Sequence, residues 1–244
     1  MRPDGTAGHG ATRHGTAGGD DRAAETVRDV PASSPAPRGL FISFEGIDGS
    51  GKSTQARLLA ERLRGDGREV LLTREPGGSP GAEEIRRLVL EGAPDRWSAE
   101  TECLLFTAAR RDHLERTIRP ALAAGVVVIC DRFADSTRVY QGITRGDLRG
   151  IVDRLHAMMI GVEPDLTLVI DIDPTLGLAR ARARQGAEER FEDFGLGLQE
   201  RMRAGFLGLA AEFPERIRLI DGSGGPEVVA ARVTACVTAG LAAR

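Results

Sequence analysis

The sequence predicts an α/β fold in which one sheet of five parallel strands carries helices on both faces. From residue 39 onward, five short apolar runs alternate with longer segments whose apolar residues recur at helical spacing. A glycine-rich loop, GIDGSGKST at residues 46–54, stands between the first apolar run and the first helical segment. Strand, glycine loop and helix in this order are typical of a phosphate-binding loop.

Each strand is predicted from a short apolar run. The expected strands are residues 40–44, 69–74, 126–131, 166–172 and 216–221. Helices are predicted from apolar residues three and four apart, such as Ala56, Leu59, Ala60 and Leu63 in the first helix. The expected helices are residues 53–64, 82–92, 98–124 and 136–160, further helices up to about residue 213, and a last helix over 226–243. Catalytic loops should gather at the carboxyl ends of the parallel strands.

The first 38 residues differ in composition from the rest of the chain. They are rich in Gly, Ala, Pro and Thr, and their only large aliphatic residues are Val27 and Val30. Such a segment cannot bury enough apolar surface to order itself, so we expect a disordered tail at residues 1–38. It also lacks the apolar core of a secretory signal. One domain is expected over residues 39–244.

The bulk composition excludes several classes of partner. A net charge of −3 over 244 residues gives no general attraction to nucleic acid or to an anionic membrane. No apolar stretch approaches the length of a bilayer span. The cysteines, Cys103, Cys130 and Cys236, are odd in number and form no C-x-x-C pair, which favours reduced thiols in a cytoplasmic protein.

The loop at residues 46–54 contains the only lysine among 33 Lys and Arg residues. Gly46, four further residues and then Gly51-Lys52-Ser53 fit the pattern G-x-x-x-x-G-K-[ST]. Backbone N–H groups of such a loop surround a nucleotide β-phosphate, the lysine reaches the β and γ oxygens, and the hydroxyl ligates Mg²⁺. Lysine is a compact point charge where arginine is a planar fork, so its survival here indicates a site of tight geometry. The predicted ATP-binding residues of the loop are Gly46, Ile47, Asp48, Gly49, Ser50, Gly51, Lys52, Ser53 and Thr54.

A second polar cluster, DRFADSTRVYQG at residues 131–142, directly follows an apolar strand. An aspartate at this position, Asp131, is placed to hold Mg²⁺ beside a phosphate-binding loop, directly or through water. The adjacent Arg132 can donate two hydrogen bonds to a phosphate. Tyr140 is the only tyrosine of the chain; it could be a core residue, but its polar neighbours favour a functional role.

Other classes of P-loop protein fit less well. Guanine-reading GTPases use an Asn-Lys-x-Asp element, and the chain contains no asparagine. Motors and helicases are usually longer and need arginines from neighbouring subunits. A small-molecule kinase remains.

Five segments resemble bacterial thymidylate kinases in order and spacing: FEGIDGSGKST, TREPGG (73–78), LLFTAARRDHL (104–114), DRFADSTRVYQG and PDLTLVIDIDP (164–174). The resemblance covers residues 40 to about 243. It implies a P-loop nucleotide kinase fold with a mobile lid, usually as a homodimer. It also implies transfer of the ATP γ-phosphoryl group to dTMP, giving dTDP and ADP, in dTTP synthesis for DNA replication.

The resemblance assigns a role to each motif residue of this chain. Lys52 holds the donor phosphates with Mg²⁺ at Ser53, and Asp48 reaches the sugar and phosphate region of the acceptor. Glu75 is expected near the acceptor sugar. Arg86 and Arg132 are expected to clamp the acceptor phosphate. The residues expected around the nucleoside are Phe106 stacked on thymine, Arg110 donating to its O4, Ser136, Thr137 and Gln141 on the base or phosphate, and Tyr140 at the 2′ side of the sugar.

Arg180, Arg182 and Arg184 are expected to begin the lid. The P-loop itself holds no arginine, so the resemblance implies that the lid brings one to the transferring phosphoryl group, here Arg184, with Arg180 on ATP. The chain departs from the family pattern at Arg138, where a small residue is common. It departs again near the lid, with Phe194, Leu198 and Gln199.

No general base is expected, because the second pKa of a phosphate monoester is about 6 and the attacking oxygen is already anionic. His113 and His156 are therefore expected to be structural.

Several alternatives stay open. Arg110 could be a surface residue that covers Phe106 on one helix face. Residues 178–190 could be a solvated basic helix, and Asp173 a helix cap. The rival functions are a kinase for another pyrimidine nucleotide and a catalytically silent P-loop protein that regulates a partner.

Overall fold

The computed structural model describes residues 38–93, 95–144, 146–183 and 195–242. In this part of the chain, one five-stranded sheet has the order β2-β3-β1-β4-β5, and each neighbouring pair of strands is parallel. The strands are β1 (Phe41–Glu45), β2 (Val70–Arg74), β3 (Val127–Asp131), β4 (Leu166–Asp171) and β5 (Ile217–Asp221). The predicted fold class and all five strands are confirmed.

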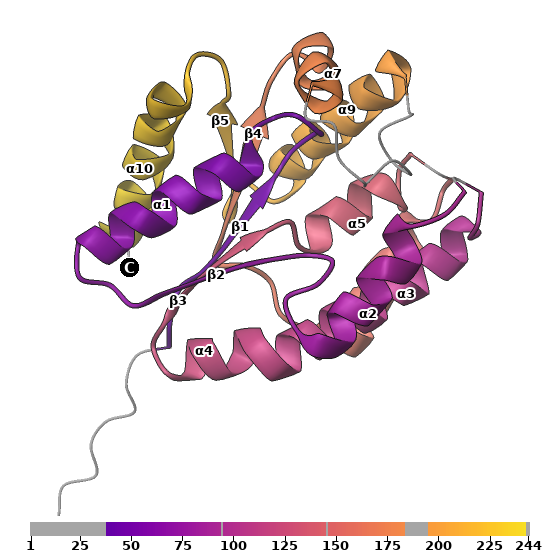
Figure 1. The fold of residues 1–244 in the computed structure, drawn as a ribbon, viewed down its shortest axis with the longest axis horizontal. Coiled ribbons are helices and arrows are strands. Elements are labelled where there is room, and N and C mark those ends of the chain that lie inside the picture. The colour runs from indigo at the N-terminus through magenta and orange to yellow at the C-terminus, as the bar shows by residue number, and fades with distance from the viewer. Residues whose placement is uncertain (1–37, 94, 145, 184–194, 243–244) are drawn as a thin grey trace, which may run out of the picture. The chain divides into compact units, whose positions relative to one another are not determined.

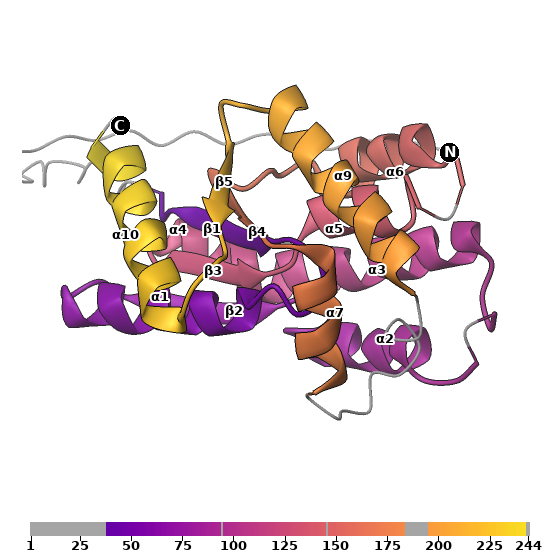
Figure 2. The same cartoon turned by 90° about the horizontal axis from the view of Figure 1, so that it is seen from above.

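Helices cover both faces of the sheet (Figures 1 and 2). On one face, α1 (Lys52–Gly65) and α10 (Pro226–Ala242) pack together and share a core with Ile42, Phe44 and Ile170 of the strands. On the other face the core forms two clusters. The helical elements there include η1 (Leu114–Ile118), α4 (Arg119–Ala123), α5 (Ala134–Tyr140), η2 (His156–Ile160) and α9 (Leu196–Glu212). The alternation of side chains along β1 sends Phe41, Ser43 and Glu45 to this second face.

The remaining helices follow the predicted segments with one exception. They are α2 (Pro80–Leu90), α3 (Ala99–His113), α6 (Arg149–Leu155) and α7 (Pro174–Arg182). The predicted helix 98–124 is present as α3, a π-helical turn and α4 in unbroken succession. The prediction of one helical stretch over 136–160 is wrong, because α5 ends at Tyr140 and α6 begins only at Arg149.

Two glycines explain the interruption between α5 and α6. The N–H of Gly142 donates to the carbonyl of Thr137 at 3.0 Å, five residues back, which ends the regular helix. Gly146 adopts φ 143, a conformation that favours glycine. The spacing of apolar residues gives no information on such local backbone turns.

The predicted tail, residues 1–38, lies outside the described residues except for Arg38. Within the described residues, no helix is both long and apolar enough to cross a membrane.

Candidate active site

The P-loop joins β1 to α1 and is shaped by glycines. Gly46, Gly49 and Gly51 have φ values of 130, 76 and 96, which other residues rarely adopt. A Cβ on Gly49 would lie 2.0 Å from the carbonyl oxygen of Gly177, so only glycine lets α7 approach the loop this closely. The sequence thus forms a turn whose backbone is open to a phosphate.

Lys52 lies at the first position of α1 and is buried, with 5% of its surface exposed. Its Nζ donates to the carbonyl of Ile47 at 2.7 Å, inside the loop. Burial and then the charge of Arg132 lower the pKa of Lys52 to about 8, against the carboxylates of Asp48, Asp131 and Glu45 that raise it. A polyanionic phosphate here would add a further charge that favours the ammonium form.

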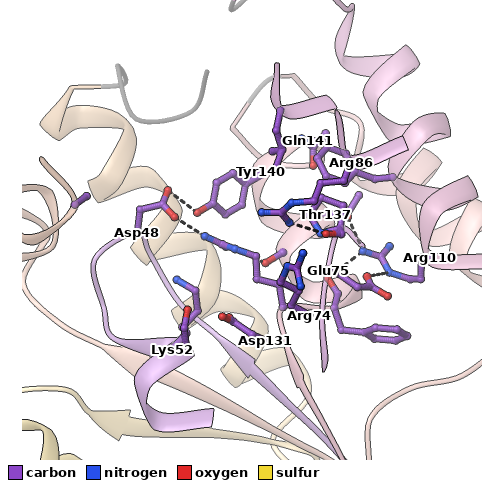
Figure 3. A pocket seen from close by; sticks show the side chains of 18 of the residues that line it. Asp48, Lys52, Arg74, Glu75, Arg86, Arg110, Asp131, Thr137, Tyr140 and Gln141 are labelled. Atoms are coloured by element: carbon purple, nitrogen blue, oxygen red, sulfur yellow. Dashed lines mark hydrogen bonds and ion pairs between the residues drawn. The ribbon is translucent and has the colours of Figure 1, made fainter. Parts of the chain in front are cut away.

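Arg132, Asp48 and Tyr140 form a connected group beside the loop; Figure 3 labels Asp48 and Tyr140. The guanidinium of Arg132 donates to one carboxylate oxygen of Asp48, and the Tyr140 hydroxyl donates to the other at 2.9 Å. Burial alone would raise the pKa of Asp48, but Arg132, Lys52 and Tyr140 together hold it below its ordinary value. Burial raises the pKa of Tyr140, so it stays a neutral donor.

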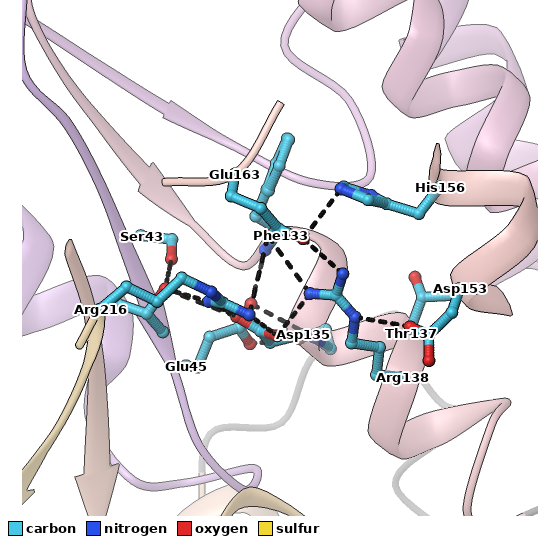
Figure 4. Close-up of polar contacts among 12 residues, drawn as sticks. Ser43, Glu45, Phe133, Asp135, Thr137, Arg138, Asp153, His156, Glu163 and Arg216 are labelled. Atoms are coloured by element: carbon cyan, nitrogen blue, oxygen red, sulfur yellow. Dashed lines mark hydrogen bonds and ion pairs between the residues drawn. The ribbon is translucent and has the colours of Figure 1, made fainter. Parts of the chain in front are cut away.

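The backbone at Arg132 adopts φ 71, an unusual value for a residue other than glycine. Glu45, fully buried at the end of β1, holds the next turn in place (Figure 4). One of its oxygens accepts the N–H groups of Phe133 at 2.7 Å and Ser136 at 3.2 Å, and the other accepts the Ser136 hydroxyl at 2.6 Å. Burial, followed by the charge of Asp135, raises the pKa of Glu45 to about 7.

Arg110 of α3 lies at the other side of the site. Its Nε donates to Glu75 Oε2 at 2.7 Å, and one terminal nitrogen donates to the carbonyl of Phe133 and the hydroxyl of Thr137 at 3.1 and 3.0 Å. With 4% of its surface exposed, Arg110 is no surface residue, so the alternative that it merely covers Phe106 from solvent is wrong. The Glu75 carboxylate accepts from Arg110 and contacts His113, so its predicted contact with a sugar stays a prediction.

A cavity of about 370 Å³ lies between the P-loop, Arg132 and Arg110. Figure 3 shows Lys52 and Asp131 at one end of it and Arg110 with Glu75 at the other. The cavity brings together fifteen of the predicted site residues: Asp48, Gly49, Gly51, Lys52, Ser53, Glu75, Arg86, Phe106, Arg110, Asp131, Arg132, Ser136, Thr137, Tyr140 and Gln141.

The other predicted residues do not line it. Gly46, Ile47 and Ser50 are buried parts of the loop, Thr54 is half-buried on α1, and Arg180 is half-buried on α7. Arg184 and Phe194 lie outside the described residues. Asp173 is the N-cap of α7 and accepts from the N–H groups of Thr175 and Leu176, which confirms the predicted helix cap.

Sequence reasoning missed five further lining residues, Arg74, Pro76, Leu90, Phe133 and Ala181. Arg74 and Pro76 stand inside the quoted TREPGG segment, and Phe133 follows Arg132, so their position in the motifs could have indicated them. Glu45 and His113 support the site from behind. Only their contacts in three dimensions reveal this role.

Asp131 and Ser53 suit a magnesium ion. Asp131 Oδ1 is buried and accepts no hydrogen bond from any described residue, and both residues line the cavity next to Lys52. A carboxylate oxygen and a hydroxyl are the hard ligands that Mg²⁺ prefers, with water and phosphate oxygens completing its shell. The donor set therefore fits the ion.

Fold and site define the class of protein. It has a P-loop nucleotide kinase fold, with a glycine-rich loop and a cluster of arginines lining one cavity at the carboxyl edge of a parallel sheet. The family model "Thymidylate kinase" matches residues 44–233. The chain belongs to the thymidylate kinase family.

Individual relatives agree with the family model. The chain is 76% identical to the thymidylate kinase of Ruegeria pomeroyi, over 82% of this chain and 94% of that protein. It is 65% identical to the thymidylate kinase of a Jannaschia species, over 83% of this chain and 98% of the relative. The crystal structure of the Ehrlichia chaffeensis thymidylate kinase is similar with a TM-score of 0.67 and 36% identity, over 83% of this chain and 99% of the other.

Proposed function

We propose that the protein is an ATP-dependent nucleoside monophosphate kinase that transfers the γ-phosphoryl group of ATP to dTMP, giving dTDP and ADP. The product serves dTTP synthesis for DNA replication. The observation that carries the proposal is a cavity that is lined both by the P-loop and, at its other end, by the buried Arg110, with Phe106 one helical turn before it on α3. Family membership supports the same reaction.

At the donor end, the P-loop holds the phosphates of ATP. Its N–H groups and the Lys52 ammonium neutralise charge on the β and γ oxygens. The same cations must screen the approach of two polyanions, since ATP and a monophosphate repel each other. We assign Arg180 to the binding of ATP and Arg184 to the stabilisation of the phosphoryl group during its transfer.

Ser53 and Asp131 would hold Mg²⁺. A bound ion would supply positive charge that stabilises the charge developing on the donor phosphates during transfer. Removal of divalent cations with EDTA should abolish turnover, and Mg²⁺ should restore it.

At the acceptor end, the guanidinium groups of Arg132 and Arg86 would clamp the phosphate of dTMP. Asp48 orients Arg132 through the hydrogen bond between them. Tyr140, held by Asp48, would face the 2′ side of the sugar. An anionic phosphate oxygen attacks the γ-phosphorus directly, because the second pKa of a phosphate monoester is about 6 and no base must remove a proton.

The base would lie between Phe106 and Arg110. Arg110 carries donors only, so it pairs with the acceptor at the 4-position of thymine and not with the amino group of cytosine. Ser136, Thr137 and Gln141 complete the base and phosphate contacts.

Release of ADP tests the proposal, measured with a coupled assay and a panel of nucleoside monophosphates. We expect rapid ADP release with dTMP and little with purine nucleotides. Fastest turnover with a different pyrimidine nucleotide would favour the kinase for another substrate. Nucleotide binding without acceptor-dependent ADP release would favour a silent regulatory protein.

We also propose that the protein is a homodimer acting in the cytoplasm. Leu104 on α3 and Met158 and Met159 in η2 are exposed apolar residues on elements that pack side by side. Exposed apolar residues on neighbouring elements are typical of an interface. Light scattering should give twice the chain mass. A Leu104→Glu/Met158→Glu double variant should be monomeric, whereas Leu219→Glu, an exposed apolar residue of β5, should stay dimeric.

A further inference from the structure

We infer that His113 is a positioning residue for base selection: through Glu75 it sets the orientation of Arg110. The inference rests on the proposed function, in which Arg110 reads the 4-position of the base. Nothing in the role of His113 requires it to touch a substrate, since it is fully buried behind Glu75.

The guanidinium of Arg110 is largely committed to the protein. Nε donates to Glu75, and Nη2 donates to Phe133 and Thr137. Its plane lies over the Phe133 ring, 5.1 Å from the centroid. Nη1 forms no hydrogen bond with the described residues, and Arg110 lines the cavity. One nitrogen is thus left to donate to a ligand.

The pairing with Glu75 determines which nitrogen of the Arg110 guanidinium faces the ligand. Its Oε2 accepts from Arg110 Nε, while its Oε1 lies 3.1 Å from His113 Nδ1. A carboxylate held at one oxygen can turn about its terminal bond, because this torsion has a broad, shallow profile. The second contact, with His113, fixes the carboxylate plane and therefore the guanidinium that pairs with it.

His113 is itself held from behind. Its Nε2 lies 2.8 Å from the Thr73 hydroxyl, so the contacts fit the tautomer with the proton on Nδ1, which donates to Glu75. Gly78 closes over the ring with φ 86, and a Cβ there would lie 2.3 Å from Nε2. The second glycine of TREPGG is needed at this position because any side chain would displace His113.

Glu75 and His113, together with the neighbouring Cys130, do not form a suitable site for a metal ion. Glu75, His113 and Cys130 place ligand atoms within 4.8 Å of one another. Both Glu75 oxygens already contact protein donors, however, and one of these donors is the Arg110 cation. A metal ion would place a second cation beside a buried guanidinium, which is costly.

Rejection of cytosine depends on a fixed donor facing its amino group. A site built for one hydrogen-bond pattern rejects the other because a buried polar group is left unpaired. If Arg110 can turn, another group or water can satisfy it, and the penalty for cytosine falls. Loss of His113 should therefore lower selectivity more than it lowers ATP binding.

The test compares kcat/KM for dTMP and dCMP, and KM for ATP, in three variants. For His113→Leu, we expect kcat/KM for dTMP to fall about tenfold, as for one lost hydrogen bond. We expect the dTMP-to-dCMP ratio to fall by a similar factor while KM for ATP changes less than about twofold. His113→Asn should recover most of the ratio, because its amide N–H can replace the donor at Nδ1. The control is Thr107→Val, which removes a buried hydrogen bond to the carbonyl of Cys103 on the same helix; its ratio should equal that of the wild type.

An unchanged ratio in His113→Leu, with equal losses for both nucleotides, would overturn the inference and leave His113 a purely structural residue. If that variant does not fold, Thr73→Val serves instead. It removes the support at Nε2, and an unchanged ratio there also overturns the inference. Failure of the proposed function looks different, since wild-type protein would then not prefer dTMP in the first place.

Discussion

The ammonium group of Lys52 occupies a small space inside the P-loop, where Nζ meets the carbonyl of Ile47 at 2.7 Å. A guanidinium is larger and planar, and its nitrogens diverge from the axis of the side chain. Arginine would preserve the positive charge, but its guanidinium could not donate to the Ile47 carbonyl from the same position.

Lys52→Arg should therefore lower kcat at least about 100-fold, the scale of losing one preorganised electrostatic contact. Steady-state ADP release measures the effect. Arg57→Lys is the matched control, because Arg57 pairs with Glu61 on the exposed face of the same helix and should tolerate the exchange. Retention of more than about a third of the wild-type kcat would refute the argument from shape.

The raised pKa of Glu45 predicts that the free energy of unfolding depends on pH. Its pKa rises from 4.5 in the unfolded chain to about 7 in the folded protein, chiefly through burial. Between these values the folded state binds more protons than the unfolded state, so stability falls as pH rises from about 4.5 to 7. A shift of this size corresponds to about 3 kcal/mol.

Urea unfolding at pH 5 and pH 8 tests this expectation in wild type and Glu45→Gln. The amide can still accept from Phe133 and donate to Ser136, so the variant should fold and should lose less stability over this range, by about 2–3 kcal/mol. Glu61→Gln, exposed on α1, should keep the wild-type slope. Equal slopes in wild type and Glu45→Gln would contradict the role of burial.

Sequence motifs predicted the residues that line the cavity far better than those behind it. Lys52, Asp131 and Arg132 stand in short patterns whose spacing reflects contact with a phosphate. Glu45 and His113 act through partners 91 and 38 residues away in the chain. No local pattern contains such pairs, because only folding brings them together.

At the scale of elements, α5 carries Ser136, Thr137 and Tyr140 of the site and is held by buried ion pairs (Figure 4). Asp135 accepts from Arg216 of the turn before β5 at 2.6 and 2.9 Å and from Arg138 at 2.8 Å. Burial would raise the pKa of Asp135, but these arginines hold it below its ordinary value.

This network accounts for Arg138, at a position where the resemblance to the family led us to expect a small residue. Arg138 Nε donates to Asp153 at 3.0 Å, and the guanidinium also contacts Glu163. His156 Nε2 lies 3.1 Å from the same Glu163. The large side chain is accommodated because α6 and the segment before β4 supply its counter-charges.

Arg216→Met should lower the free energy of unfolding by about 3 kcal/mol, because it leaves part of the Asp135 charge buried without its partner. A cycle with Asp135→Asn should show a coupling of about 1 kcal/mol or more, since the two side chains share hydrogen bonds. Denaturant unfolding gives these values. Arg218→Met, an exposed neighbour on β5, should change stability by less than about 0.5 kcal/mol. Additive effects of Arg216 and Asp135 would contradict the coupling.

The strands were predicted to within about two residues because their apolar runs are short and sharply bounded. The break in the helix after α5 was not predicted from the sequence, because it depends on backbone turns at Gly142 and Gly146. The π-helical turn at Leu114–Ile118 also went unpredicted. Pro120 follows it, and proline cannot donate to a carbonyl in the preceding turn, so the backbone pairing changes without changing the apolar pattern.

For the whole molecule, the alternation of strand-like and helix-like apolar patterns along the chain predicted a parallel sheet with helices on both faces. The order of the strands, β2-β3-β1-β4-β5, was not predicted, because apolar runs of similar length carry no information on which strands are neighbours. The family model begins at residue 44 and ends at residue 233, so it includes most of the sheet and leaves the first residues of the chain unmatched.

Deletion of residues 1–37 should leave kcat and both KM values within about twofold of the full chain, because the segment holds no motif and too few apolar residues to pack. The same coupled assay, with purified substrates, compares the two proteins. Loss of activity or of folding in the truncated chain would mean that the segment belongs to the catalytic unit.

We propose that the cavity receives dTMP with Arg110 at the 4-position of the base. The decisive measurement is kcat/KM for dTMP, dUMP and dCMP in wild type and in Arg110→Gln. A missing methyl group costs about 1–3 kcal/mol, so dUMP should be weaker by roughly 10- to 200-fold, while dCMP should be essentially inert. Arg110→Gln should relax the exclusion of dCMP, because an amide can present either a donor or an acceptor. Wild-type protein that accepts dCMP as well as dTMP would contradict the account.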